Sequence, residues 1–193
     1  MITLPVVKKT DVFGKTVFLR LDLDVPLTET KSIEDDSRLL AGLPTLKFLL
    51  ENGARVIVAG HLGRPKSLDN ESGIMDQEFS LEPVARWFGI KYKALSIKQG
   101  KRGEFGGWEI APNLFLLENL RFYKGEVEND SEFAKILASL ADVYVNDAFA
   151  VSHRNSVSVV GITKYLPHFA GFQLQKEVEV LSGGLENPKR PLA

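Results

Sequence analysis

Four short apolar runs are separated along the chain by stretches in which apolar residues recur at helical spacing. The runs cover residues 17–21, 56–59, 114–117 and 143–145, and polar or turn residues follow each of them. They lack the alternation of a half-exposed strand, which is typical of parallel strands buried on both faces. Since right-handed crossovers place helices on both sides of such a sheet, the pattern predicts a doubly wound, Rossmann-like α/β fold with three layers, α/β/α.

Capping signals predict where the intervening helices begin and end. Asp35 or Asp36 is expected to cap a helix with four leucines on one face, and Gly53 is expected to close it in a left-handed conformation. Further along, Asn129 with Glu132 three residues later is a candidate capping box for a second helix.

Length and composition limit the class of protein. The 193 residues, 44% of them hydrophobic, suffice for a domain of ordinary size with a sizeable core. The 24 Lys and Arg residues nearly balance 25 Asp and Glu residues, and the net charge of −1 favours neither nucleic acid nor an anionic membrane as partner. The absence of cysteine excludes disulfides, thiolate zinc sites and cysteine nucleophiles. Charges among the first twenty residues and the lack of an apolar run of ~18 residues indicate no signal peptide or membrane span, which predicts a cytoplasmic protein.

Polar side chains gather where the predicted strands end. Because the carboxyl ends of parallel strands meet at one edge of a sheet, these side chains are expected to lie together. Guanidinium groups bind phosphate or carboxylate through paired, charge-assisted hydrogen bonds, so the arginines predict a small polyanion as ligand. The carboxylates would either orient the arginines or accept hydrogen bonds from a ligand hydroxyl, and a hydroxylated phospho-acid meets both needs. The residues concerned are Asp22, Asp24, His61, Arg64, Asn119, Arg121, Asn146, Asp147, His153 and Arg154, with Arg38 nearby.

Two of these features also have an interpretation in which they bind no ligand. A His-x-x-Arg loop after a single strand, such as His61 to Arg64, is by itself more often a solvated turn than a ligand site. Arg38 lies in the first turn of a predicted helix, where the positive end of the helix dipole does not favour it. Arg38 therefore either contacts a ligand or pairs with a nearby acidic residue, Glu34, Asp35 or Asp36.

Motifs of several other chemistries are absent from the sequence. No GxGxxG follows the first apolar run and no GxxxxGK[ST] occurs, which excludes the usual dinucleotide and Walker-type phosphate sites. The three histidines lack the HExxH spacing of a metalloprotease, and no GxSxG marks a serine nucleophile. Binding and charge stabilisation remain, and these are what a protein contributes to phosphoryl transfer.

Five segments resemble one known family in their order and spacing. The amino-terminal domain of phosphoglycerate kinases has motifs similar to LRLDLDVP, GHLGRPK, LLENLRFYKGE, DVYVNDAFAVSHR and LENPKRP, which together span nearly the whole chain. The resemblance implies half of a glycolytic kinase, a domain that holds 3-phosphoglycerate or 1,3-bisphosphoglycerate in a basic patch. It also implies a catalytic role for Arg38, which would bridge to the transferring phosphoryl group. The implied substrate contacts are Asp22, Leu23, Asp24, Arg38, His61, Leu62, Gly63, Arg64, Arg121 and Arg154.

The resemblance divides the chain into two parts. Residues 1–172 would form the substrate-binding domain, and residues 173–193 would form the interdomain helix and the lead into a carboxyl-terminal nucleotide-binding domain that this chain lacks. Mg-ATP or Mg-ADP would bind to that missing domain, and no cofactor or metal site is expected here. The chain alone is therefore expected to be inactive and monomeric, without a nucleic-acid or membrane partner. The alternative is a stand-alone, non-catalytic module that binds phospho-acids.

Three departures from the family pattern bear on this expectation. Asp24 stands where the family usually has Asn, and a carboxylate cannot donate a hydrogen bond and repels an anion. The segment 91–113 matches poorly, shows only weak strand signals and carries no expectation of function. The loop before and after Arg154 differs from the usual pattern at Ala150, Val151, Ser152 and Ser156.

Overall fold

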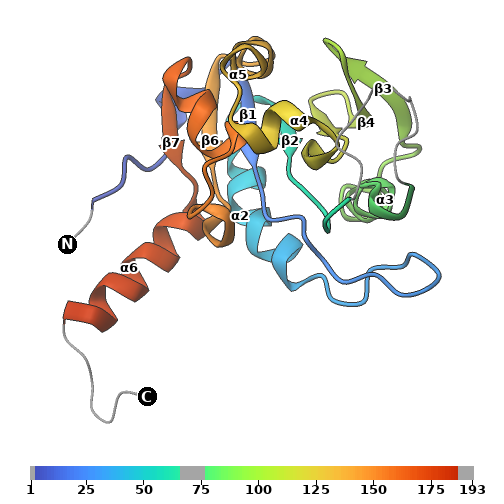
Figure 1. Ribbon diagram of the computed structural model, residues 1–193, viewed down its shortest axis with the longest axis horizontal. Coiled ribbons are helices and arrows are strands. Elements are labelled where there is room, and N and C mark those ends of the chain that lie inside the picture. Colours follow the sequence, from blue (N-terminus) through green and yellow to red (C-terminus); the bar gives the residue numbers. More distant parts are fainter. Residues whose placement is uncertain (1–2, 66–76, 187–193) are drawn as a thin grey trace.

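The structure of the chain, a computed structural model, describes residues 3–65 and 77–186. Its centre is a seven-stranded sheet (Figure 1). Five neighbouring strands run parallel, and the four apolar runs form four of them, β1, β2, β5 and β6, as predicted. In spatial order the strands are β3 (Lys98–Arg102), β4 (Phe105–Ala111), β5 (Leu114–Leu117), β2 (Arg55–Ala59), β1 (Thr16–Arg20), β6 (Val143–Asn146) and β7 (His168–Ala170).

Successive residues of a buried strand point to opposite faces, and this alternation creates two cores. In β1, Val17 and Leu19 belong to the core that contains residues of α2 (Ser37–Glu51) and α3 (Glu82–Lys91). Phe18 between them belongs to the opposite core, with residues of α5 (Ser131–Ala138) and of the π-helix Val157–Gly161. Helical segments therefore cover both faces of the sheet, and the predicted three-layer α/β/α fold is confirmed.

The segment 91–113 forms the antiparallel edge of the sheet, which the apolar pattern did not predict. β3 pairs antiparallel with β4, and β4 pairs antiparallel with β5. The residues of β3 are Lys-Gln-Gly-Lys-Arg, so no apolar run marks this strand. Gly107 in β4 has a packing reason, because a β-carbon there would lie 2.1 Å from the Leu116 carbonyl oxygen of β5.

The backbone confirms one predicted helix end and corrects another. Gly53, just after α2, has a φ of +78°, as predicted for a left-handed end. The capping box assigned to Asn129 is wrong, because Asn129 ends the short helix α4 (Lys124–Glu128) with a φ of +55°. The next residue caps α5 instead, since the Asp130 carboxylate accepts the Phe133 N–H at 2.7 Å. Asn and Asp cap helices equally well, so their order in the sequence does not decide between them.

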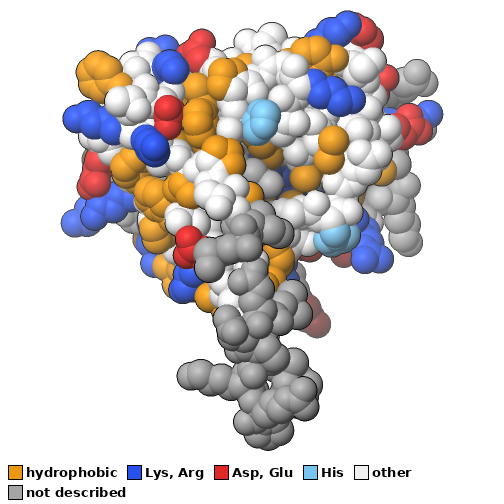
Figure 2. Space-filling view, turned by 90° about the vertical axis from the view of Figure 1, so that its left-hand side faces the viewer, with side chains coloured by type: hydrophobic (Ala, Val, Ile, Leu, Met, Phe, Trp, Pro, Cys, Tyr) orange, Lys and Arg blue, Asp and Glu red, His pale blue; other side chains and the backbone are white. Residues whose placement is uncertain are grey.

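Helix α6 (Phe172–Glu186) extends away from the body of the molecule (Figure 1). Its first turn packs on α2, where the rings of Phe172 and Phe48 are 5.0 Å apart. Farther along, Val180 is 66% and Leu181 is 49% exposed. Figure 2, which faces the side on which α6 projects, shows apolar side chains among charges of both signs. Helix α6 agrees with the helix expected from residue 173 onward, while residues 187–193, with most of the LENPKRP motif, lie outside the described part.

A short helix, α1 (Lys9–Val12), precedes β1. None of the helices in the described part of the chain is long and apolar enough to cross a membrane.

Candidate functional site

The ends of β1, β2, β5 and β6 lie at one edge of the sheet. Arg20, the last residue of β1, pairs in register with Ala59 at the end of β2 and with Asn146 at the end of β6. β5 adjoins β2 in the same direction. The loops that follow these strands carry the predicted polar residues, so the expectation that the strand ends share one edge is confirmed.

A basic cavity of about 270 Å³ opens at this edge; we call it the strand-end cavity. Its charged and titratable lining residues are Arg20, His61, Arg121, Glu126, His153 and Arg154. Burial and four arginines lower the pKa of His61 to about 2, so its ring is neutral. The arginines that act on it are Arg20, Arg121, Arg154 and Arg38. Because arginine stays protonated in proteins, the cavity concentrates positive charge against one lining carboxylate, that of Glu126.

Arg121 contacts the loop that follows β2. The 3-10 helix Leu120–Phe122 carries it, and its Nη1 donates to the carbonyl oxygen of Gly63. Burial and the charge of Arg154 lower the pKa of Arg121. The predicted edge residue Asn119 holds this arrangement from inside, since its side chain accepts the Arg121 N–H and donates to the carbonyl oxygen of Leu62 at 2.7 Å. Asn119 is fully buried, so its role is structural.

Arg38, in the first turn of α2, pairs with Asp22 in the loop after β1. Its Nη1 lies 3.1 and 3.3 Å from the two carboxylate oxygens of Asp22. Two alternative acidic partners have other donors, because Asp35 accepts a backbone N–H at the start of α2 and Asp36 accepts from Trp87 Nε1 at 2.8 Å. The side chain of Arg38 is 49% exposed, so its ion pair is weak and a ligand can replace it at small cost.

Asp24 lies against the loop that follows β2. Its Oδ1 accepts the Gly63 N–H at 2.7 Å, and its Oδ2 is 3.6 Å from Nε2 of His61. Gly63 has a φ of +60°, and a β-carbon there would lie 2.2 Å from the Phe79 ring. Only glycine therefore fits at this position, and the backbone N–H that it presents is taken by Asp24.

Three implied substrate contacts differ in how they can reach a ligand. Leu23 is fully buried and Leu62 is 4% exposed, and both belong to the core on the α2 side of the sheet. Their side chains therefore face the core, and only their backbone is available to a ligand. Arg64 is exposed, and its positive charge contributes to the lowered pKa of Arg121.

Eight of the ten implied site residues line one of three cavities. His61, Arg121 and Arg154 line the strand-end cavity together. Asp22 and Arg38 line a second cavity, of about 240 Å³, that reaches the first turns of α6. A third cavity, of about 420 Å³, is lined by Asp24, Leu62 and Gly63.

Asp147, one of the predicted edge residues, joins the end of β6 to α6. Its Oδ1 accepts the backbone N–H groups of Gln173 at 2.8 Å and Leu174 at 3.1 Å. Burial raises the pKa of Asp147 to about 6, although these hydrogen bonds and one from Thr45 oppose the rise. Its role in the free protein is thus to hold the first turn of α6.

Sequence reasoning missed two charged residues of the strand-end cavity. Arg20 is 2% exposed and stands inside the apolar run 17–21, and Glu126 is 4% exposed. A lone arginine in an apolar run is a usable signal, because a charge is buried only where it has partners. No comparable local signal marks Glu126, which follows the strand end by several residues in a polar stretch.

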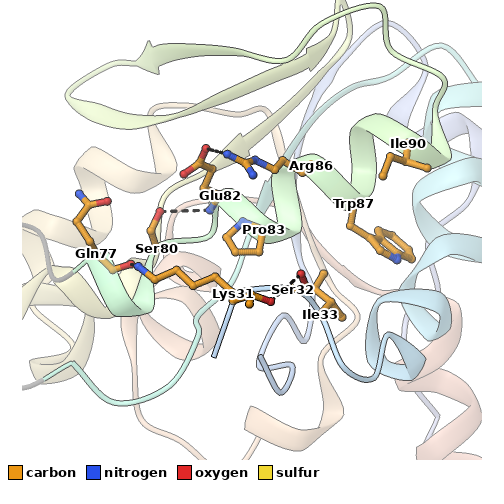
Figure 3. A pocket seen from close by; sticks show the side chains of 11 residues that line it. Lys31, Ser32, Ile33, Gln77, Ser80, Glu82, Pro83, Arg86, Trp87 and Ile90 are labelled. Atoms are coloured by element: carbon orange, nitrogen blue, oxygen red, sulfur yellow. Dashed lines mark hydrogen bonds and ion pairs between the residues drawn. The ribbon is translucent and has the colours of Figure 1, made fainter. Parts of the chain in front are cut away.

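A larger cavity, of about 440 Å³, lies between the 27–33 hairpin and α3 (Figure 3). Its charged side chains already have partners, since Arg86 donates to Glu82 at 2.7 Å and Lys31 donates to the backbone carbonyl oxygen of Gln77 at 2.9 Å. Its lining holds two basic side chains and one acidic one, so it concentrates less positive charge than the strand-end cavity, which holds three arginines and one acidic side chain. Across the described ranges, no group of three or more His, Asp or Glu side chains is placed to hold a metal ion.

Comparison with known proteins identifies relatives of this fold. The family model of phosphoglycerate kinase matches residues 7–193. Over 192 residues, the chain is 47% identical to phosphoglycerate kinase 1, chloroplastic, of Arabidopsis thaliana. This match covers 95% of the chain and 38% of that protein. It is 45% identical to the cytosolic phosphoglycerate kinase of Nicotiana tabacum, over 96% of this chain and 46% of that protein.

Solved structures agree with the sequence matches. The structure of phosphoglycerate kinase from Coxiella burnetii has a TM-score of 0.76 and 38% identity, over 94% of this chain and 45% of that one. The enzyme from Pyrococcus horikoshii OT3 has a TM-score of 0.73 and 32% identity over the same shares. The chain thus spans less than half the length of these relatives. The match over residues 7–193, on a scaffold that places a basic cavity at its strand ends, shows that the chain belongs to the phosphoglycerate kinase family.

Proposed function

We propose that this chain is the phospho-acid-binding half of a phosphoglycerate kinase and that it holds 3-phosphoglycerate or 1,3-bisphosphoglycerate at its strand ends. The observation that carries the proposal is the strand-end cavity, in which Arg20, Arg121 and Arg154 meet around neutral His61. Three guanidinium groups that face one lining carboxylate leave positive charge uncompensated, and a phosphate group supplies the missing negative charge.

The proposed roles follow from where each side chain lies. Arg121 and Arg154 bind the phosphate of the acid, and the exposed Arg64 adds charge at the rim. Asp24 accepts a hydrogen bond from the hydroxyl of the acid, while Leu23, Leu62 and Gly63 contribute only backbone groups. Arg38, released from Asp22, stabilises the transferring phosphoryl group, which makes it the catalytic residue of this half.

In the whole protein, we propose reversible phosphoryl transfer between the acid and ADP or ATP in glycolysis. The supporting observation is that relatives named phosphoglycerate kinase are more than twice as long as their matched part. A carboxyl-terminal domain binds the magnesium-bound nucleotide, residues 1–172 bind the acid, and the segment from residue 173 connects the two. We further propose a cytoplasmic monomer, although the relatives are named both cytosolic and chloroplastic.

A thermal melt with and without 3-phosphoglycerate tests acid binding. A ligand at 100 times its dissociation constant adds about 2.7 kcal/mol of stability, which raises the Tm of a domain of this size by roughly 5–11 °C. Glycerol phosphate, which lacks the carboxylate, is the control ligand and is expected to give a smaller shift. No shift at millimolar 3-phosphoglycerate would contradict the proposal.

One observation favours a second candidate, a non-catalytic module that binds phospho-acids. The Asp24 carboxylate accepts a hydrogen bond from the Gly63 N–H, a donor that an anionic ligand would otherwise use. The gene sequence beyond Ala193 distinguishes the two candidates. A nucleotide-binding half in the same reading frame supports the kinase, and a stop codon directly after residue 193 supports the module.

A further inference from the structure

At the strand-end cavity, three buried polar residues, Arg20, Ser158 and Glu126, form one hydrogen-bonded network. Nε of Arg20 donates to the Ser158 hydroxyl at 3.0 Å, and that hydroxyl donates to Oε1 of Glu126 at 2.6 Å. The Ser158 backbone N–H donates to the other carboxylate oxygen of Glu126 at 2.8 Å. Arg20 and Glu126 are at most 4% exposed and Ser158 is fully buried, so little of this network contacts bulk water.

The backbone around Ser158 keeps this residue in place. Ser158 belongs to the π-helix Val157–Gly161, a conformation that is rare and often found at functional sites. Its carbonyl oxygen accepts a hydrogen bond from the Tyr144 hydroxyl at 2.7 Å. The side chain of Ser158 therefore has a fixed direction from which it joins Arg20 to Glu126.

The same arginine determines the protonation pattern of His61. Nη2 of Arg20 lies 3.0 Å from Nδ1 of His61. Arginine has donors only, so Nδ1 must accept and cannot carry a proton. The neutral ring then carries its proton on Nε2, which lies 3.6 Å from Oδ2 of Asp24. Burial and the surrounding arginines keep the pKa of His61 near 2, which agrees with a neutral ring.

Glu126 is the group that makes the position of Arg20 stable. A guanidinium this deeply buried needs a negative charge and acceptors, or it moves toward water. Glu126 is the first of the charges that oppose the effect of burial on the pKa of Arg20. Two other acceptors of Arg20 are backbone carbonyl oxygens, those of Leu21 at 2.5 Å and Ala59 at 3.4 Å, which carry no net charge.

We propose that Glu126 is a positioning residue of the phospho-acid site: through Ser158 it fixes Arg20, and Arg20 fixes His61 with its proton on Nε2, ready to donate to Asp24 or to a bound acid. The part that concerns the acid rests on the proposed function. The part that concerns His61 is a property of the free protein, and it can be measured without ligand.

Nitrogen-15 NMR of the histidine rings in this chain at pH 7 tests the inference. In the wild type, the His61 shifts are expected to show a bare Nδ1 and a protonated Nε2. Ser158→Ala removes the link to Arg20, and Glu126→Gln removes the charge. In both variants His61 is expected to become a mixture of tautomers. The dissociation constant for 3-phosphoglycerate is expected to rise about tenfold. In metal sites, losing a residue that positions a ligand-binding side chain lowers affinity by about 10- to 100-fold, and we take the lower end of that range.

Matched controls separate positioning from general destabilisation. Glu128→Gln changes an exposed carboxylate on the same helix, and Ser139→Ala removes an exposed hydroxyl that bonds only a backbone carbonyl at the end of α5. Both controls are expected to keep the His61 tautomer and the affinity of the wild type. If Glu126→Gln does not fold, Ser158→Ala decides the question, because the smaller change leaves the Glu126 carboxylate in place.

The possible outcomes distinguish this inference from the proposed function. A wild-type chain that does not bind 3-phosphoglycerate contradicts the proposed function, whereas a change of the His61 tautomer in Ser158→Ala still supports the positioning role. A His61 ring that keeps its tautomer in Ser158→Ala overturns the inference, even if that variant melts at a lower temperature. Binding by the wild type with unchanged affinity in both variants also overturns it.

Discussion

At the scale of single residues, carboxylates at the strand ends occupy donors that an anionic ligand needs. Asp22 takes the guanidinium of Arg38, and Asp24 takes the backbone N–H of Gly63. A phosphate or carboxylate ligand must therefore share or replace these bonds, and its affinity is the difference between two sets of charged hydrogen bonds. Among the arginines that line the strand-end cavity, those that have no carboxylate partner should contribute most to binding.

Replacing Arg121 or Arg154 by alanine is expected to weaken binding of 3-phosphoglycerate by roughly 1.5–3 kcal/mol each, as for a hydrogen bond to a charged group. The exposed Arg64 is expected to contribute less, under ~1 kcal/mol, because it lies outside the lining of the strand-end cavity and solvent screens its charge. Titration calorimetry measures these differences. Arg86→Ala, which removes an arginine paired with Glu82 on α3, is the control and should bind like the wild type. Wild-type affinity in both the Arg121 and the Arg154 variant would refute the assignment.

Asp24→Asn is expected to tighten binding of 3-phosphoglycerate by under ~1 kcal/mol, because it removes a negative charge near a negative ligand. The amide oxygen can still accept the Gly63 N–H, so the loop should keep its conformation. Calorimetry of this variant is compared with Glu34→Gln, an equal charge change on an exposed residue near α2. Weaker binding by Asp24→Asn would mean that the negative charge of Asp24 favours the ligand, beyond the hydrogen bond that an amide oxygen could also accept.

The buried His61 should make folding sensitive to acid. Its pKa is about 2 in the folded chain, against an ordinary value of 6.5, so the unfolded chain binds the proton more tightly. The stability from a neutral His61 is complete above pH 6.5 and is lost as the pH falls toward 2, by up to about 1.4 kcal/mol per pH unit. Urea unfolding from pH 7 to pH 4 measures this loss. His61→Asn, whose amide oxygen can replace Nδ1 as acceptor, should show a smaller loss, and an equal loss would contradict the explanation.

At the scale of elements, apolar runs predicted the central strands, whereas the outer strands of the sheet, such as β3 and β7, could be located only in the structure. β1, β2 and β5 are buried along nearly all their length, and apart from Arg20 their buried residues are apolar. β3 is exposed and polar, and β7 has three residues, so neither carries a pattern that local sequence reasoning can detect. The start of α6 depends on contacts with Asp147, which lies 26 and 27 positions before Gln173 and Leu174.

Asp147 is expected to couple the attachment of α6 to pH. Its pKa is about 6 in the folded chain and 3.8 ordinarily, so the folded chain binds the proton more tightly. This group's contribution to stability is therefore greatest below pH 3.8 and falls as the pH rises through 6, by roughly 3 kcal/mol for a shift of about two pH units. This sign is opposite to that of His61, so each group must be tested with its own variant.

The measurement for Asp147 is urea unfolding between pH 4 and pH 7 in the wild type and in Asp147→Asn. The amide keeps an oxygen that can accept from Gln173 and Leu174, but it does not titrate. The variant should gain stability relative to the wild type as the pH rises through this range. A constant difference between the two proteins across the range would show that Asp147 does not titrate as described.

At the scale of the whole molecule, the described part of the chain has a basic cavity at its strand ends and a helix, α6, that extends away from the rest of the fold. The exposed Val180 and Leu181 on α6 are apolar surface that a further domain would cover, in accord with the proposed kinase. The relatives' greater length supports the same arrangement. The proposed kinase function therefore requires a second half.

This chain alone is expected to bind 3-phosphoglycerate without transferring a phosphoryl group. Holding two reactants together is worth roughly 7–11 kcal/mol of the barrier, and without a held nucleotide that contribution is lost. A coupled assay of ATP consumption with the purified chain checks this, and a full-length relative serves as the positive control. Turnover by the chain alone would contradict the two-domain proposal.

The sequence by itself determined the fold class and the family, because both depend on patterns that are local: apolar runs, polar strand ends and five short motifs in order. It also determined that arginines would gather at one edge, since strand ends in a parallel sheet coincide. Only the tertiary structure decided which charges meet. Arg38 pairs with Asp22 rather than with its acidic neighbours, and Arg20 reaches Ser158 across 138 positions of sequence. Such pairings depend on distances between separate elements, which no local pattern of side chains records.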